Sequence, residues 1–263
     1  MQASVTTSDG VALRFDRVGA GPRVLCLHAM MTDGRYFGAR RENGFVHALG
    51  CEATVADFRG HGESVPPVAG RDDWSFDDLV EKDLPALAAG ADAIIGHSLG
   101  GLVALAGIAT GVIPAPRRLV LVATNVWLGG GLRRGAIMAA YRGVTALFGR
   151  APIRALHLGH ADEAKTYVAQ LTGWQRSGRW TSLGGVDYMA ALDMVRVPTL
   201  VVAGAGDWMC TPDDAAVIGR HLRTDVRVVG KAHGDALDPD HFQLFTRPEL
   251  TRLRDEIARF VTS

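Results

Sequence analysis

The chain has 263 residues, a length that α/β folds often reach as a single domain with a large core, and its content of 48% hydrophobic and 21% charged residues is ordinary for a soluble globular protein. Its 28 basic side chains are balanced by 28 acidic ones, so the charge gives no sign of a nucleic-acid partner. It has no apolar run long enough to cross a membrane, no secretory signal pattern and no CxxC pair, so we expect a cytoplasmic protein without disulfides.

Short apolar runs alternate with helical patterns along most of the chain, which predicts βα units and a mainly parallel sheet. The first two runs flank a turn at residues 8–10 and predict an antiparallel hairpin. The later runs are almost continuously apolar, as expected for strands that are covered on both faces. The eight predicted strands are residues 4–7, 11–18, 23–28, 53–57, 93–97, 118–123, 199–203 and 226–229.

Helical patterns lie between these strands and are marked by capping residues. Ser75 is a candidate N-cap, and two aspartates follow in the first turn, where the helix dipole favours anions. Gly111 suits the end of another helix, and Pro212 suits a first turn. The predicted helices are residues 76–88, 99–110, a segment that begins at 211–212, and 247–261.

One long segment interrupts this alternation. From Asn125 to about Val195 the sequence shows amphipathic helical stretches and no strand pattern, so we expect a helical cap inserted over the edge of the sheet. This divides the chain into a first core part (1–124), a helical cap insertion (125–195) and a second core part (196–263).

The pentapeptide Gly96-His97-Ser98-Leu99-Gly100 has the pattern G-x-S-x-G. An apolar strand precedes it and a helix follows it, which is the setting in which this pattern carries a serine nucleophile. The two glycines leave room where a side chain would collide with the neighbouring strand and helix. We therefore predict that Ser98 is the nucleophile; the alternative is a tight turn with an N-capping serine.

Three segments resemble motifs of the α/β-hydrolase superfamily. Residues 27–31 (LHAMM) resemble its His-Gly oxyanion loop, residues 57–64 resemble its D-x-R-G-x-G-x-S loop, and the pentapeptide resembles its nucleophile elbow. Residues 73–87 further resemble a branch of poorly characterised bacterial hydrolases. The resemblance covers nearly the whole chain and implies the α/β-hydrolase fold: an eight-stranded, mostly parallel sheet flanked by helices, with a helical cap insertion.

A serine nucleophile needs a histidine as base and a carboxylate that orients the histidine, and in this fold they follow the serine in the order acid, histidine. Asp207 comes after a buried strand and a glycine loop, at the sheet edge where catalytic groups gather. It is the predicted acid; the alternative is that it caps the helix that begins near Thr211. Asn125 stands where some relatives carry the acid, and it is not acidic.

Two late histidines compete for the role of base. His233 lies four residues after the last predicted strand, which matches the commoner ending. His241 lies in the sequence Asp-His-Phe-Gln-Leu, which resembles the D-H-x-D-L motif at the catalytic histidine and leaves room for one terminal helix. Gln243 departs from that motif, where an acidic residue is usual. We favour His241, with His233 as the runner-up.

Two backbone N–H groups are expected to form an oxyanion hole. Leu99 supplies one because it follows the nucleophile at a helix N-terminus, and the resemblance implies Met30 as the second. His28 is expected to support this loop and to border the substrate pocket. Trp127 and Trp174 either line an apolar acyl pocket or pack the cap.

Other polar residues are expected to have structural roles. Those of the segment 57–64 brace a turn. His157 and His160 lack a third ligand at metal spacing, so we expect neither a metal site nor a cofactor.

These residues predict a serine hydrolase that cleaves a carboxylic ester, a thioester or an amide of a small to medium apolar acyl group through an acyl-enzyme. Acyl transfer would use the same triad if the cap excludes water. A non-catalytic ligand receptor usually lacks the histidine or the acid, and here candidates for all three roles are present. Ser98 argues against dehalogenases and epoxide hydrolases, which carry aspartate at this position. We expect a small-molecule, ester-like substrate and no membrane partner; the sequence indicates neither the substrate's identity nor the oligomeric state.

Overall fold

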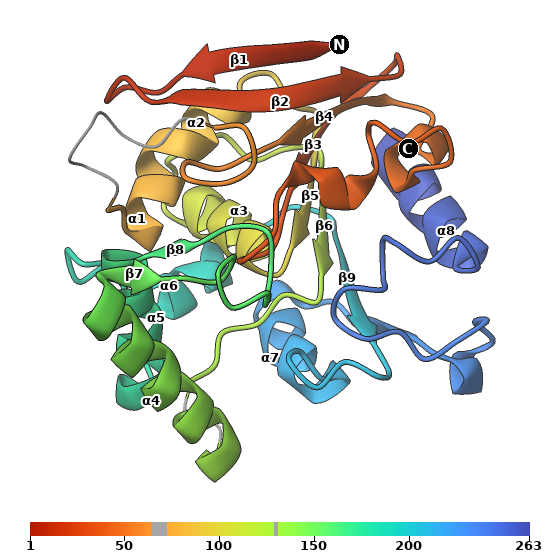
Figure 1. Ribbon diagram of the computed structural model, residues 1–263. Helices are drawn as coiled ribbons and strands as arrows, with labels where there is room; N and C mark the ends of the chain where they lie inside the picture. Colours follow the sequence, from red (N-terminus) through yellow and green to blue (C-terminus); the bar gives the residue numbers. More distant parts are fainter. Residues whose placement is uncertain (65–72, 129–130) are drawn as a thin grey trace.

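The computed structural model describes residues 1–64, 73–128 and 131–263 (Figure 1). Its centre is an eight-stranded sheet with the order β1-β2-β4-β3-β5-β6-β9-β10. The ends of the predicted strands are displaced by no more than two residues in the structure. The strands are β1 (Gln2–Thr6), β2 (Ala12–Val18), β3 (Arg23–Leu27), β4 (Glu52–Ala56), β5 (Ala93–His97), β6 (Arg118–Val122), β9 (Thr199–Gly204) and β10 (Val226–Val229).

The sheet is mostly parallel, as predicted. β2 runs antiparallel to its neighbours β1 and β4, and the other neighbouring strands pair in parallel. Every residue of β5 is buried, and in β3 and β6 only the first residue is not. Strands of this kind are covered on both faces, and Figure 1 shows α3 on one side of the sheet and α8 on the other.

Capping residues and prolines fix where the flanking helices begin. Ser75 and Thr211 each form a capping box with an aspartate three residues later. The final helix begins at Thr251, later than predicted, because Pro248 disfavours helical backbone at the residue before it. The helices outside residues 125–195 are α1 (Phe76–Asp78), α2 (Leu84–Leu87), α3 (Leu99–Ala109), α7 (Pro212–Leu222) and α8 (Thr251–Thr262), with short 3₁₀-helices η1 (Gly34–Phe37), η2 (Phe45–Ala48) and η5 (Lys231–His233).

The helix predicted over 76–88 is interrupted by a π-helical turn, η3 (Leu79–Asp83), between α1 and α2. There the backbone N–H of Leu84 donates to the carbonyl of Leu79, five residues earlier. Pro85 has no N–H to donate and its ring crowds the preceding turn, which accounts for the wider helix at this point.

The segment 125–195, here called the insertion, lies between β6 and β9, and its residues 129–130 are outside the described part of the chain. Figure 1 shows its helices beyond the carboxyl ends of the central strands. It also contains a two-stranded antiparallel sheet that the sequence did not predict, since strands of two residues are too short to show an alternating pattern. Its elements are α4 (Gly131–Phe148), β7 (Arg150–Ala151), β8 (Glu163–Ala164), α5 (Lys165–Ser177), α6 (Tyr188–Ala191) and η4 (Leu192–Met194). None of the described helices is both long and apolar enough to span a membrane.

Candidate active site

Ser98 occupies a strained turn between β5 and α3. Its φ of 50° and ψ of −110° lie outside the regions that residues other than glycine usually adopt. A Cβ atom on Gly96 would lie 2.5 Å from the Cα of Gly101, and one on Gly100 would lie 2.3 Å from the carbonyl oxygen of Leu27. Only glycines therefore allow this turn to close. Ser98 stands at the N-cap position of α3, but its side chain forms no capping hydrogen bond to that helix.

Asp207 and His241 are joined by a buried hydrogen bond. Asp207 Oδ2 lies 2.7 Å from His241 Nδ1, and Oδ1 accepts the backbone N–H groups of Met209 and Cys210 at 2.8 and 2.9 Å. In neutral His241 the proton is therefore on Nδ1 and the lone pair on Nε2. Within the described residues His241 Nε2 is buried and has no hydrogen-bond partner. The cap of α7 is Thr211, so Asp207 does not have the helix-capping role considered from the sequence.

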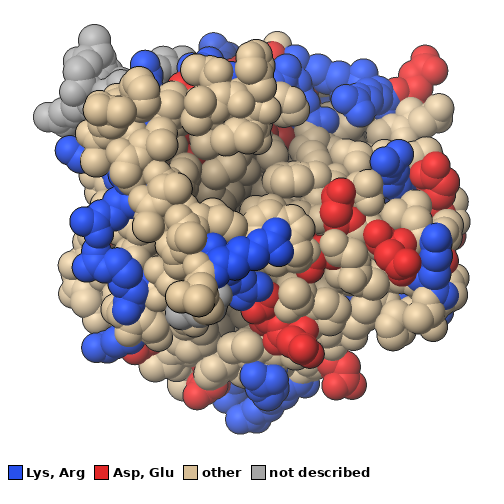
Figure 2. All heavy atoms as spheres, turned by 60° about the horizontal axis from the view of Figure 1, so that its bottom comes forward, with Lys and Arg blue, Asp and Glu red and all other residues tan. Residues whose placement is uncertain are grey.

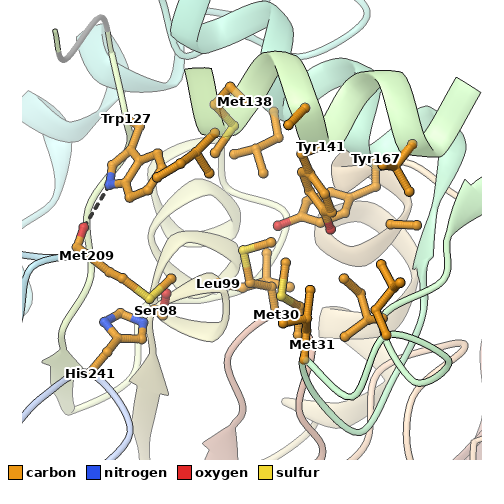
Figure 3. Close-up of a pocket in the computed structure, with 18 of the residues that line it drawn as sticks. Met30, Met31, Ser98, Leu99, Trp127, Met138, Tyr141, Tyr167, Met209 and His241 are labelled. Atoms are coloured by element: carbon orange, nitrogen blue, oxygen red, sulfur yellow. Dashed lines mark hydrogen bonds between the residues drawn. The ribbon is translucent and has the colours of Figure 1, made fainter. Parts of the chain in front are cut away.

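His241 and Ser98 line the same cavity, and Figure 3 shows the imidazole ring beside the serine. His233 is exposed on η5, does not line this cavity, and accepts the Arg252 side chain at its backbone carbonyl. The structure thus brings His241, and not His233, to Ser98 and Asp207.

Two residues that the sequence did not identify hold the loop of His241. His97 Nε2 lies 3.0 Å from the carbonyl oxygen of His241 and donates to it. Burial, together with the neighbouring His241, holds the pKa of His97 well below its ordinary value, so this ring is neutral. The ring of Tyr36 stacks on His97, with centroids 5.0 Å apart. His97 was visible as the second residue of the pentapeptide; Tyr36 belongs to no sequence motif.

The loop after β3 lies next to the nucleophile. The backbone N–H of Gly100 donates to the carbonyl of His28 at 3.0 Å, which ties this loop to the turn of Ser98. Met30 and Leu99 both line the cavity, and the backbone N–H of neither forms a hydrogen bond to any described residue. Two N–H groups that line the cavity beside Ser98 are thus free to bind a ligand oxygen.

Met31 is held by the insertion. Its backbone N–H lies 2.5 Å from Glu163 Oε1, and its carbonyl accepts the N–H of His160 at 2.7 Å. Glu163 is fully buried, and His61 Nε2 lies 3.3 Å from the same carboxylate oxygen. Burial lowers the pKa of His61, but the charge of Glu163 and its hydrogen bond outweigh burial, so the pKa is raised overall.

His28 does not line the cavity, contrary to the expectation from the sequence; of the two tryptophans for which a pocket role and a packing role were considered, Trp127 lines the cavity and Trp174 does not. His28 lies beneath the loop, where its Nδ1 donates to the carbonyl of Ala29 at 2.7 Å and its Nε2 accepts the N–H of Phe58 at 3.1 Å. Burial, with a contribution from His61, lowers its pKa to about 3. Trp174 packs against Phe76 of α1 and against Trp180 of the insertion, and its indole N–H donates to the carbonyl of Thr181 at 2.7 Å.

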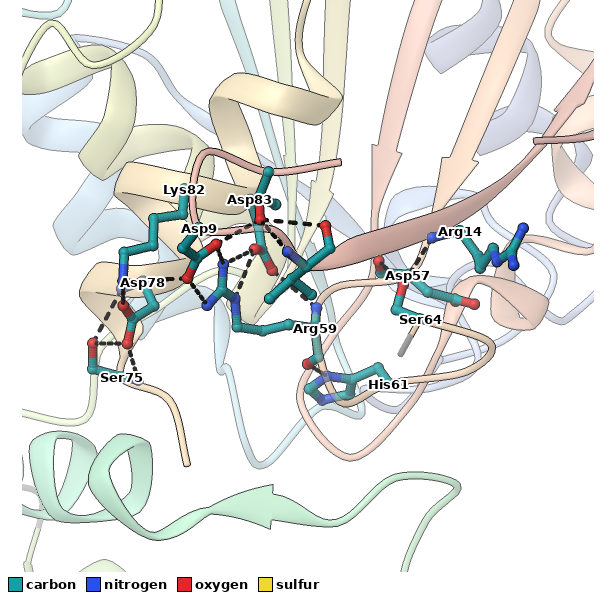
Figure 4. A network of polar contacts seen from close by, with 12 residues as sticks. Asp9, Arg14, Asp57, Arg59, His61, Ser64, Ser75, Asp78, Lys82 and Asp83 are labelled. Carbon is teal, nitrogen blue, oxygen red and sulfur yellow. Dashed lines mark hydrogen bonds and ion pairs between the residues drawn. The ribbon is translucent and has the colours of Figure 1, made fainter. Parts of the chain in front are cut away.

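The segment 57–64 forms polar contacts that brace its turn (Figure 4). The buried guanidinium of Arg59 pairs with Asp83 at 2.7 Å and with Asp9 at 2.9 Å. Ser64 Oγ donates to the carbonyl of Asp57 at 2.7 Å. These contacts lie within the fold and leave none of these side chains in the cavity.

The cavity has a volume of about 370 Å³, within the range of small-molecule sites. Both the sheet domain and the insertion contribute to its walls, and no Asp, Glu, Lys or Arg is among the described lining residues. Figure 2 turns this end of the molecule forward and shows a hollow bordered mainly by uncharged atoms. The lining residues are Met30, Met31, Ser98, Leu99, Leu102, Asn125, Trp127, Ile137, Met138, Ala140, Tyr141, Val144, Ala151, Pro152, Ile153, Leu156, Leu158, Tyr167, Leu171, Trp208, Met209 and His241.

Within the described ranges, no group of three or more His, Cys, Asp or Glu side chains is arranged to hold a metal ion.

Comparison with known proteins identifies the family and the fold. Residues 24–251 match the model of a family described as the alpha/beta hydrolase family. Among similar solved structures are an esterase from Exiguobacterium antarcticum (18% identity, TM-score 0.70, all of both chains covered) and a bromoperoxidase from Bacillus anthracis (16%, 0.69, all of both chains). A hydrolase from Pseudomonas aeruginosa has 22% identity and a TM-score of 0.64, over 100% of this chain and 98% of that one. No curated protein has a significant sequence match.

Proposed function

The chain belongs to the alpha/beta hydrolase family, and we propose that this hydrolase is a serine esterase that works through an acyl-enzyme. One observation carries the proposal. Asp207 lies 2.7 Å from His241 Nδ1, the other ring nitrogen (Nε2) has no hydrogen-bond partner within the described residues, and His241 lines the same cavity as Ser98.

Acylation begins when Ser98 Oγ attacks the carbonyl carbon of the ester. His241 Nε2 takes the serine proton, and Asp207 holds the ring and stabilises the imidazolium that forms. The backbone N–H groups of Met30 and Leu99 bind the developing oxyanion, each contributing about 3 kcal/mol to lowering the barrier. His241 then protonates the leaving alkoxide, and an acyl group remains on Ser98.

Deacylation uses the same groups with water. His241 takes a proton from the water as its oxygen attacks the acyl carbon, and Ser98 leaves with the proton returned by His241. The net reaction is ester plus water to carboxylic acid plus alcohol.

The cavity favours an uncharged, mainly apolar substrate of small to medium size. Its walls include Ile137, Met138, Val144 and Leu171, all from the insertion, which we propose acts as a cap over the site. Proteins of this fold from Exiguobacterium antarcticum and Thermogutta terrifontis are described as esterases, which makes esters the first class to test.

The test is the Ser98→Ala variant with p-nitrophenyl acetate and butyrate. We expect wild-type turnover and labelling by a fluorophosphonate probe, and the loss of both in Ser98→Ala. Ser8→Ala, at an exposed serine, is the matched control and retains both. Full activity of Ser98→Ala would contradict the proposal. Product analysis with an added alcohol separates hydrolysis from acyl transfer.

A further inference from the structure

Two tyrosines line the mainly apolar cavity. Tyr141 belongs to α4 and Tyr167 to α5, and Figure 3 shows their side chains below α4, across the cavity from His241. The Tyr141 hydroxyl is shielded from solvent and has no hydrogen-bond partner in the described part of the chain. The Tyr167 hydroxyl likewise forms no hydrogen bond to a described residue. Because buried hydroxyls are nearly always paired, a ligand or water has to supply the missing partner.

Two other polar side chains of the cavity wall, Asn125 and Trp127, already use an N–H group in a hydrogen bond. Asn125 Nδ2 donates to the carbonyl of Met209 at 3.1 Å, and Trp127 Nε1 donates to the same oxygen at 2.7 Å. The two tyrosines therefore provide the free hydrogen-bonding capacity at the end of the cavity remote from His241.

The surroundings of these hydroxyls define the chemistry of their partner. Burial, with contributions from Glu163, holds the pKa of Tyr141 and of Tyr167 well above its ordinary value, so both remain neutral O–H donors. No lysine or arginine lines the cavity in the described ranges, and two acidic groups, Asp162 and Glu163, act on Tyr141. An anionic ligand would therefore find no positively charged side chain among the described residues that line the cavity. An uncharged oxygen acceptor fits both the donors and the apolar walls.

We propose that the substrate carries an uncharged oxygen acceptor, such as a ketone, ether or hydroxyl oxygen, at the end of its apolar chain remote from the scissile ester, and that Tyr141 and Tyr167 bind it. This inference rests on the proposed esterase function for the position of the ester at Ser98. The tyrosines determine specificity, because an analogue without the oxygen leaves the Tyr141 hydroxyl buried and unpaired.

The experiment compares pairs of esters of equal length, one plain and one with a ketone on the penultimate carbon. The chain is placed on the acyl side in one series and on the alcohol side in another, from four to ten carbons. We expect wild type to favour the ketone in at least one series by about tenfold in kcat/KM, mostly through KM. Tyr141→Phe and Tyr167→Phe are expected to reduce this preference, measured in each variant as the ratio of kcat/KM for the ketone ester to kcat/KM for the plain ester of the same pair. Tyr188→Phe, whose buried hydroxyl bonds Asp77 outside the cavity, leaves the preference unchanged.

A second measurement does not depend on turnover. Calorimetry compares the binding of a methyl ketone and of the equally long alkene to the Ser98→Ala protein, with and without Tyr141→Phe. The phenylalanine substitution is expected to weaken ketone binding alone. Equal hydrolysis of both members of every pair by wild type, or ketone binding that Tyr141→Phe leaves unchanged, overturns the inference. If wild type hydrolyses none of the plain esters, the proposed esterase function is wrong. The calorimetric comparison of ketone and alkene still decides the role of the tyrosines in that case.

Discussion

The backbone N–H of Met31 lies 2.5 Å from the carboxylate of Glu163, which follows it 132 residues later in the chain. The carbonyl of Met31 is bound by the N–H of His160, so the insertion holds both polar atoms of this peptide. Met31 has a φ of 61°, which residues other than glycine rarely adopt without such restraint. The preceding residue, Met30, is the expected oxyanion donor, so its direction depends on this contact.

Replacement of Glu163 is therefore expected to affect catalysis more than binding. Glu163→Ala removes the acceptor of the Met31 N–H, and kcat for p-nitrophenyl butyrate should fall about 10- to 100-fold, with KM within about threefold of wild type. Glu163→Gln keeps an oxygen for this N–H and should retain most of kcat. Asp162→Asn, one residue earlier, is the control. A Glu163→Ala protein with a lower Tm and an unchanged kcat would show that the contact has only a structural role.

The assignment of the base is tested by comparing the two histidines. Asp207→Asn and His241→Ala should each lower kcat by about 10⁴-fold, because the first misdirects the imidazole and the second removes the base. His233→Ala should be close to wild type, since this side chain is exposed and outside the cavity. Steady-state kinetics on p-nitrophenyl butyrate measures all three. An inactive His233→Ala beside an active His241→Ala would reverse the assignment.

The elements that were predictable from the sequence are those whose signal is local. The buried strands are continuous apolar runs. The turn of Ser98 requires glycines at fixed positions, which the pattern G-x-S-x-G shows directly. The position of His241, in contrast, depends on a contact between segments that are distant in the sequence. The loop that carries His241 is placed by a hydrogen bond from Gly206 N–H to the carbonyl of Pro239 at 3.2 Å, and a Cβ on Gly204 would lie 2.3 Å from that carbonyl oxygen. The sequence of neither loop predicts this contact.

The contacts between the insertion and the sheet domain were also not predictable. His61 and Glu163 are 102 residues apart, and each alone is an ordinary polar residue. Similarly, the large apolar side chain of Trp174 predicts that it is buried. The sequence does not indicate which face of α5 lines the cavity. Such pairings depend on how the insertion packs, which short-range patterns do not encode.

Buried His28 is expected to make the protein acid-sensitive. In the unfolded chain it binds a proton below about pH 6.5, whereas in the folded protein its pKa is about 3. Between these values the unfolded state binds more protons, so the free energy of unfolding decreases as the pH falls. The contribution of His28 is complete above pH 6.5 and is lost on the way to pH 3.

The measurement is urea unfolding of wild type and His28→Asn at pH 7 and pH 5. The advantage of wild type over the variant should be about 2 kcal/mol smaller at pH 5, because each pKa unit corresponds to about 1.4 kcal/mol. His233→Asn, at an exposed position, is the control. A wild-type advantage that stays constant between the two pH values would contradict this account of His28.

The pair of Arg59 and Asp83 should contribute to stability through its burial. Arg59 Nε donates to Asp83 Oδ1 at 2.7 Å, and the side chains are 2% and 0% exposed. Burial raises the pKa of Asp83 to about 6 despite the pairing with Arg59, so the carboxylate depends on this partner for its charge. Asp83→Ala leaves a buried guanidinium with only Asp9 as partner, and the expected loss of stability is about 3–5 kcal/mol. Urea unfolding measures this loss. Glu63→Ala, which breaks an exposed pair with Arg40, should cost only about 0–1 kcal/mol. Similar losses in the two variants would show that Arg59 finds water or another partner when Asp83 is removed.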